Sequence, residues 1–375
     1  MTEKERLNRT LSFQPVDRPP LFEIALWEQT VEAWKNQGLP EEAADANLLS
    51  GNGYFGLEGY DVAGFNLTFP EPCPDEVQVA EDDRHVTFVD GMGRTRVALK
   101  EGSIRGMRMS MDCYVDFPVK NRDDFLRIRD KYLLNRQDRI PVDWPKILSR
   151  LGRSSRPSTL LDRHFGSFGY YSMLRDWMGT EGLSYMLYDD PDLVHECLEF
   201  LTTHITGEWL ARPLREARFD LFYIHEDMAG RNGPLLSPGM FREFLLPHYR
   251  RFVEFLKGCG VSNVVVDTDG EFEMLIPAFL EAGVEGFGPV ERAAGMDPVS
   301  LREKYGKAFF MIGGIDKRVL CDGEQAVRRE LQRIVPPLLR DGGFIPTIDH
   351  SIPPDVPLRS FLKYLELKRE TISGG

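Results

Sequence analysis

The sequence predicts an α/β fold, a (β/α)8 TIM barrel with a β-hairpin inserted near residues 77–99. Short apolar runs of strand length alternate with amphipathic stretches of helix length about eight times along the 375 residues. Several of these runs end directly in charged residues, as strands do at the carboxyl end of a barrel. No G-x-G-x-x-G motif follows an early strand, which disfavours a doubly wound dinucleotide-binding sheet.

Each expected strand is an apolar run that ends in polar residues or glycine. Residues 264–266 are three valines, a pattern typical of a strand buried on both faces. The expected strands cover residues 19–24, 61–65, 159–164, 220–225, 262–267, 284–287, 308–312 and 344–348.

Helices are expected from amphipathic spacing and from their starting signals. Ser237-Pro238 and Asp297-Pro298 each place a capping side chain before a proline at the first helical position. The opening helix is expected over residues 3–13, before Pro15. Others are expected at residues 191–210, 238–257, 272–282, 298–305 and 323–340.

The alternation breaks between residues 70 and 111. Two strand-like runs, residues 86–89 and 94–99, flank Asp90-Gly91, a dipeptide that favours a tight turn. We therefore expect a β-hairpin within an insertion over one end of the barrel. Residues 119–151 are polar and helical without a clean linker, so residues 1–375 are expected to form a single domain.

Composition narrows the class of protein. The net charge of −13 without a basic stripe argues against binding to nucleic acid or to an anionic membrane. No apolar run reaches the roughly 20 residues that span a bilayer, and the charged N-terminus has no apolar segment behind it. The five scattered cysteines suit reduced thiols, so a cytoplasmic protein is expected.

Carboxylates and histidines gather at the ends of the later expected strands. Such a cluster is stable only if its members are protonated, hydrogen-bonded or bound to a metal. Aspartate oxygens and a neutral imidazole suit Zn²⁺ or another divalent ion. The strand-end residues are Arg163, His164, His225, Glu226, Asp227, Asp267, Asp269, Glu291, Asp316, Lys317, Asp349 and His350.

Several of these residues have structural alternatives. Asp269 could simply form a turn with Gly270, and Glu226 and Asp227 could cap the helix that follows them. Asp349 could orient the His350 imidazole rather than bind substrate or metal. Asp316-Lys317 could be a surface ion pair that contributes little.

Segments along nearly the whole chain resemble the uroporphyrinogen decarboxylase superfamily. That superfamily includes the decarboxylase of haem synthesis and zinc-dependent, corrinoid-linked methyltransferases. The resemblance implies a (β/α)8 barrel with its site at the carboxyl ends of the strands, and a homodimer. The segments that carry it are Arg6-Leu7-Asn8-Arg9-Thr10-Leu11, Val16-Asp17-Arg18-Pro19-Pro20, Leu236-Ser237-Pro238-Gly239-Met240-Phe241, Gly313-Gly314-Ile315-Asp316 and His350-Ser351-Ile352-Pro353-Pro354.

The sequence departs from both branches of that superfamily. Uroporphyrinogen decarboxylases resemble one another in an arginine-rich loop after the first strand, but here residues 23–29 hold no arginine and include Glu23 and Glu28. These glutamates would repel a tetrapyrrole that bears eight carboxylates. The corrinoid-linked methyltransferases carry zinc on H-x-C-G and a later cysteine; Asp267-Thr268-Asp269-Gly270 and His350 stand at those places.

The resemblance therefore implies the corrinoid-linked O-demethylase branch. We expect a methyltransferase component that moves a methyl group from a small methoxylated substrate to a separate corrinoid protein, since no D-x-H-x-x-G segment is present. The expected zinc ligands are Asp267, Asp269 and His350. The expected catalytic residues are Glu226, Asp267 and His350, and the expected substrate-binding residues are His164, His225 and Glu291.

Two alternatives stay open. The first is a metal-free decarboxylase acting on a porphyrinogen or a smaller acid, with Asp267 and His350 as acid and base. Cationic side chains facing the site, such as Arg163 or Arg292, would favour it. The second is a barrel that only binds a ligand or partner, which the dense strand-end carboxylates disfavour because unused buried charges are costly.

Overall fold

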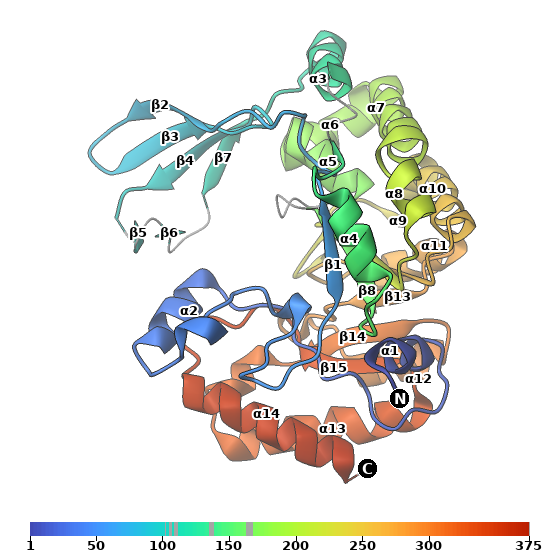
Figure 1. The fold of residues 1–375 in the computed structure, drawn as a ribbon. Coiled ribbons are helices and arrows are strands. Elements are labelled where there is room, and N and C mark those ends of the chain that lie inside the picture. The colour runs from blue at the N-terminus through green and yellow to red at the C-terminus, as the bar shows by residue number, and fades with distance from the viewer. Residues whose placement is uncertain (102, 105–106, 109–111, 135–138, 163–167, 375) are drawn as a thin grey trace.

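Seven parallel strands form the centre of the molecule, as a computed structural model of residues 1–101, 103–104, 107–108, 112–134, 139–162 and 168–374 shows (Figure 1). Neighbouring strands follow the order β1-β8-β9-β12-β13-β14-β15. This arrangement confirms the predicted α/β, TIM-barrel-like fold. The strands are β1 (Asp61–Phe65), β8 (Ser158–Asp162), β9 (Leu221–His225), β12 (Asn263–Asp267), β13 (Gly286–Gly288), β14 (Phe310–Ile315) and β15 (Phe344–Ile348).

The strand expected at residues 19–24 is wrong, although this segment fills the place between β15 and β1. Leu21 accepts a hydrogen bond from the backbone N–H of Glu58 beside β1, and Leu26 forms an isolated parallel bridge with Ile352 beyond β15. Pro19 and Pro20 lack N–H groups, so they cannot donate to a ladder. The eighth position of the barrel is therefore closed without a regular strand.

A buried ion pair anchors this irregular segment. The Glu23 carboxylate accepts hydrogen bonds at 2.7 Å from the Lys368 ammonium and from the Tyr364 hydroxyl. It also accepts one at 2.9 Å from the backbone N–H of Ile348, at the end of β15. The side chains of Glu23 and Lys368 are each 1% exposed. The expectation that Glu23 would repel a substrate at the barrel mouth is wrong, because Lys368 neutralises it inside the wall.

Helices cover the outside of the sheet (Figure 1). As predicted, Ser237 and Asp297 cap helix starts: their side chains accept from the backbone N–H groups of Met240 and Val299. Among the described residues, no helix is both long and apolar enough to cross a bilayer. The α-helices around the barrel are α1 (Glu3–Leu11), α5 (Tyr170–Met178), α6 (Thr180–Asp189), α7 (Pro191–His204), α8 (Ala211–Glu216), α9 (Pro238–Met240), α10 (Leu246–Gly258), α11 (Ile276–Glu281), α12 (Pro298–Tyr305), α13 (Glu324–Asp341) and α14 (Leu358–Ser373).

Two helices that the sequence predicts as continuous are interrupted. A π-helical turn at Ile205–Trp209 follows α7, and another at Phe241–Leu245 separates α9 from α10. Hydrophobic periodicity did not predict these turns, because each covers only five residues within a longer helical pattern.

The inserted segment forms an antiparallel sheet that projects from the barrel (Figure 1). The predicted hairpin is confirmed as β3 and β4, and its turn is closed by a hydrogen bond from the Gly93 N–H to the Asp90 carbonyl. The sheet extends to β7, beyond the expected limit at residue 111. Its strands are β2 (Val77–Glu81), β3 (His85–Val89), β4 (Thr95–Leu99) and β7 (Cys113–Asp116); short β5 (Ser103–Ile104) and β6 (Met107–Arg108) pair separately, as do β10 (Ala229–Gly230) and β11 (Gly233–Pro234). The remaining helices are α2 (Glu28–Lys35), α3 (Arg122–Leu134) and α4 (Trp144–Leu151).

Apolar residues pack on both sides of the strands, as the valine run predicts. Val264 and Val266 belong to the large core beneath the helices, whereas Val265 packs inside the barrel with Leu221, Phe310, Ile312 and Ile345. Alternation along each strand therefore determines which residues point inward. The next inward position on β12 is Asp267.

Candidate active site

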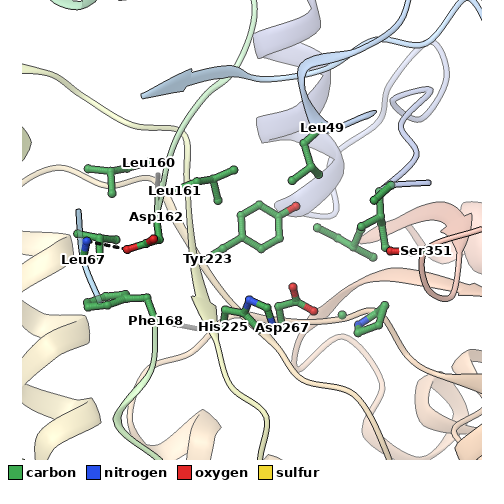
Figure 2. Close-up of a pocket in the computed structure, with 15 residues that line it drawn as sticks. Leu49, Leu67, Leu160, Leu161, Asp162, Phe168, Tyr223, His225, Asp267 and Ser351 are labelled. Atoms are coloured by element: carbon green, nitrogen blue, oxygen red, sulfur yellow. Dashed lines mark hydrogen bonds between the residues drawn. The ribbon is translucent and has the colours of Figure 1, made fainter. Parts of the chain in front are cut away.

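A cavity of about 330 Å³ opens at the carboxyl ends of the strands, where a barrel fold places its active site (Figure 2). Its walls are largely apolar, and among the described residues that line it there is no lysine or arginine. This volume lies at the small end of the range for ligand pockets. The apolar wall residues include Ile24, Leu49, Leu67, Leu160, Phe168 and Ile312, and the polar ones are Asp162, Tyr223, His225, Asp267 and Ser351.

Asp267 and His225 stand side by side at the mouth of this cavity. They are partners in the parallel register of β12 and β9, and both line the cavity (Figure 2). Burial raises the pKa of Asp267, and the negative charge of Asp269 adds to the rise, while His225 and His350 oppose it. Asp267 is thus a carboxyl group that retains a proton more readily than usual and can act as an acid.

Asp269 and His350 form an ion pair next to this mouth. The distance between Asp269 Oδ2 and His350 Nε2 is 3.2 Å. The hydrogen bond to Asp269 raises the pKa of His350 against the opposing effect of burial. Burial alone would raise the pKa of Asp269, but the hydrogen bond and charge of His350 hold it below its ordinary value. Each group therefore stabilises the charged form of the other.

Asp349 does not orient the His350 ring, contrary to one sequence-based alternative. Its fully buried carboxylate accepts hydrogen bonds from the backbone N–H groups of Arg292 at 2.8 Å and of Lys317 at 3.0 Å. Burial raises the pKa of Asp349 to about 6, and these hydrogen bonds oppose the rise. Asp349 ties together the loops that follow β13 and β14.

The described residues do not fit a preformed zinc site. Asp269 and His350 engage each other, and Asp349 is occupied by backbone donors. Nowhere in the described part of the chain do three or more His, Cys, Asp or Glu side chains form a group that could hold a metal ion. At two of the expected zinc positions, Asp269 and His350 are thus engaged in an ion pair, and the neighbouring Asp349 is engaged in backbone hydrogen bonds.

Glu226 does not point into the cavity. Its buried carboxylate accepts hydrogen bonds from the backbone N–H groups of Tyr171 and Ser172 and from the Ser172 hydroxyl, at 2.8–3.1 Å. These donors lie in the first turn of α5, the helix that follows β8, so Glu226 caps α5 from the end of β9. Burial raises the pKa of Glu226 to about 7 despite these bonds. Glu226 is thus a capping residue, but of α5 rather than of the helix that follows it, where the sequence-based alternative placed the cap.

The remaining predicted residues lie in different places. Glu291 accepts a hydrogen bond at 3.1 Å from the backbone N–H of Gly270, and it lines a separate surface hollow with Asp269 and Arg318. His164 and Arg163 fall outside the described residues. Asp316 pairs with Arg318 at 2.6 Å rather than with Lys317.

Sequence reasoning missed two polar residues of the cavity wall, Asp162 and Tyr223. The Asp162 carboxylate accepts hydrogen bonds from the backbone N–H groups of Leu67 and Thr68 at 2.6 and 2.9 Å, one of which Figure 2 shows. Tyr223 precedes His225 by two residues on β9, so strand alternation places both on the inner face. The alternation of inward-facing and outward-facing residues, counted back from His225, would therefore have identified Tyr223 as a cavity residue.

Comparison with known proteins connects this geometry to one family. The family profile of uroporphyrinogen decarboxylase (URO-D) matches residues 164–370. The chain is 28% identical over 188 residues to a uroporphyrinogen decarboxylase of Thermus thermophilus, an alignment covering 49% of this chain and 51% of the relative. It is 31% identical over 191 residues to a uroporphyrinogen decarboxylase of Nocardia farcinica, covering 49% and 51%. The chain thus spans about half the length of these curated relatives.

A solved structure matches over nearly the whole chain. It is a methyltransferase from Methanosarcina mazei, with a TM-score of 0.62, 17% sequence identity and coverage of 99% of both chains. At this identity the likeness establishes a shared fold.

Proposed function

The chain belongs to the uroporphyrinogen decarboxylase family, and we propose that within it the protein acts as a methyltransferase component on small O-methylated substrates. The size and lining of the cavity carry this proposal. About 330 Å³ with largely apolar walls suits a single substituted ring. A porphyrinogen with eight carboxylates would need more space and paired cations, which the described lining lacks.

The chain's own chemical contribution would be to protonate the oxygen that loses its methyl group. When a C–O bond breaks and the methyl group leaves, the oxygen retains the electron pair and becomes a phenolate or alkoxide. Asp267 lines the cavity, and its raised pKa keeps a proton available for that oxygen. His225 lies beside it in register and offers a second hydrogen-bonding group.

A reduced corrinoid would accept the methyl group, and it would be supplied by a separate protein. A cavity suited to one ring is too small to hold a corrin macrocycle, so the corrinoid would approach the mouth from outside. The apolar walls would hold the ring and exclude water, which strengthens the hydrogen bond between Asp267 and the substrate oxygen.

Incubation of the protein with methoxybenzenes and free cob(I)alamin tests this proposal. We expect the corresponding phenol to form, as measured by liquid chromatography, at a rate that depends on the protein. The variant Glu254→Gln, which removes an exposed carboxylate on the surface, serves as a control for the loss of a carboxylate and should leave the rate unchanged. Absence of phenol with every methoxybenzene, both with free cob(I)alamin and with a reduced corrinoid protein, using protein that is folded by circular dichroism, would refute the proposal.

Decarboxylation of a small acid is the second candidate. The curated relatives that align with half of the chain are named uroporphyrinogen decarboxylases, and Asp267 and His350 could serve as acid and base. One of the cations that would favour it, Arg292, instead pairs with Asp297 at 2.6 Å. Release of carbon dioxide from aromatic acids in the same assay would favour this reaction over methyl transfer.

A further inference from the structure

Two tyrosines at the cavity leave one hydroxyl hydrogen without an acceptor. The hydroxyl oxygens of Tyr60 and Tyr223 lie 3.2 Å apart, and the two rings meet edge to face. Two hydroxyl groups carry two hydrogens, and the bond between them uses only one. Across the described residues, neither hydroxyl has a further hydrogen-bond partner.

Burial determines which hydrogen remains free. Tyr60 is 1% exposed and packs against Phe22, with 4.8 Å between the ring centroids. A buried donor without an acceptor costs about 1–3 kcal/mol, so Tyr60 donates to the oxygen of Tyr223. Tyr223 lines the cavity, and its own hydrogen is therefore available to an occupant. Burial raises the pKa of both phenols, so both retain their hydrogens at neutral pH.

The residue that offers the available hydrogen lies deeper in the barrel than the acid, since Tyr223 pairs with Val265, two residues before Asp267. Tyr223 and His225 are two residues apart on β9, a separation of about 7 Å along the strand. Asp267 lies opposite His225, and Figure 2 shows the Tyr223 ring and the Asp267 carboxylate on the same side of β9. The cavity wall thus carries a hydrogen-bond donor and an acid whose residues are offset by two positions along the strands, among largely apolar side chains.

We propose that Tyr223 binds substrate by donating a hydrogen bond to an acceptor oxygen opposite the methylated oxygen. This inference rests on the proposed function and specifies its substrate class. The substrate is a para-substituted methoxybenzene that carries a hydroxyl, carbonyl or second methoxy oxygen. An ortho arrangement places both oxygens at the Asp267 end and leaves the Tyr223 hydrogen unpaired.

Calorimetric binding without any corrinoid tests the role of Tyr223. We expect 4-methoxyphenol and 1,4-dimethoxybenzene to bind wild-type protein about tenfold more tightly than methoxybenzene and 2-methoxyphenol, which corresponds to one hydrogen bond. Tyr223→Phe should abolish this preference. Tyr60→Phe is the matched control. It removes the other hydroxyl of the pair but leaves the Tyr223 hydroxyl, so the preference should persist. Thermal unfolding of both variants establishes that they are folded.

Compounds without a methyl ether separate this inference from the proposed function. Tighter binding of 4-methylphenol than of toluene, lost in Tyr223→Phe, supports the role of Tyr223 even if no methoxybenzene is demethylated. Demethylation without any para preference overturns the inference and leaves the proposed function intact. Binding that is equal for all rings, a preference that survives in Tyr223→Phe, or no binding of any ring also overturns the inference.

Discussion

Asp269 and His350 form an ion pair with 3.2 Å between Oδ2 and Nε2, close to a cavity whose wall holds a different aspartate, Asp267. The three residues predicted to share one metal ion are thus divided between two tasks. Asp267 lines the cavity, whereas Asp269 and His350 pair with each other and act in opposite directions on the pKa of Asp267.

Replacement of Asp267 by asparagine should lower kcat for demethylation by about 10²–10⁴-fold, because the amide cannot supply a proton. Binding of the methoxybenzene should change far less, since the amide can still donate a hydrogen bond. Steady-state kinetics and calorimetry on the same preparation measure the two effects. Retention of wild-type kcat in the variant would exclude Asp267 as the acid.

The Asp269–His350 pair should make stability depend on pH. The pKa of His350 is raised, so its contribution is fully present below the ordinary histidine pKa of about 6.5 and is lost as pH rises through the raised value. The lowered pKa of Asp269 preserves the pair until the pH falls below the ordinary aspartate range. Because both side chains are partly exposed, the contribution should not exceed about 1 kcal/mol.

Urea unfolding of wild type and His350→Gln at pH 5.5 and pH 9 measures this dependence. The variant should be less stable than wild type at pH 5.5, and the difference should shrink at pH 9. An equal difference at both pH values would contradict the pairing.

Metal content distinguishes the ion pair from the zinc site that the sequence predicts. With Asp269 and His350 engaged with each other, we expect purified, untagged protein to contain far less than one zinc per chain by plasma mass spectrometry. About one zinc per chain, lost in Asp267→Ala, Asp269→Ala and His350→Ala, would instead show that the three side chains rearrange around a metal.

Replacement of Glu226 by glutamine should destabilise the protein by about 2 kcal/mol, because one of the oxygens that accept from α5 becomes an N–H₂ group facing backbone donors. Since Glu226 lies outside the cavity wall, kcat per folded molecule should stay within about twofold of wild type. Chemical unfolding and active-site titration report the two quantities separately. A large loss of kcat in fully folded protein would return Glu226 to the catalytic residues.

Replacement of Lys368 by methionine should cost about 3–5 kcal/mol, because it leaves the buried Glu23 carboxylate without a counter-charge. The double variant Glu23→Gln/Lys368→Met should recover much of this loss, since no charge then remains buried. Urea unfolding of the two variants provides the comparison. A double variant as unstable as the single one would show that the packing of Lys368, rather than its charge, stabilises the segment.

The fold was predictable where the pattern was local. The valine run of β12, the Asp90-Gly91 turn and the capped starts of α9 and α12 each identified an element from a few adjacent residues. The positions of Asp267 and His225 followed from strand ends. The sequence could not show that Glu226 turns toward α5, because that depends on donors about 55 residues away.

The same limit explains the other errors. Glu23 appeared as a free charge because its partner, Lys368, lies 345 residues along the chain. Tyr223 was overlooked because its hydroxyl acquires a role only through contact with Tyr60, 163 residues before it. Side-chain pairing across the barrel requires the folded arrangement, whereas strand and helix patterns do not.

The missing eighth strand gives the barrel a seam. A cylinder closed by continuous ladders must break many hydrogen bonds at once to open, but here residues 19–26 are joined to their neighbours by isolated bonds and one buried ion pair. Amide hydrogens along this seam should therefore exchange with solvent sooner than those of β9 or β12. Because Ile24, Ala25 and Ser351 also form part of the cavity wall, this weakly bonded segment runs beside the cavity, so a partial opening there would widen the cavity without unfolding the barrel.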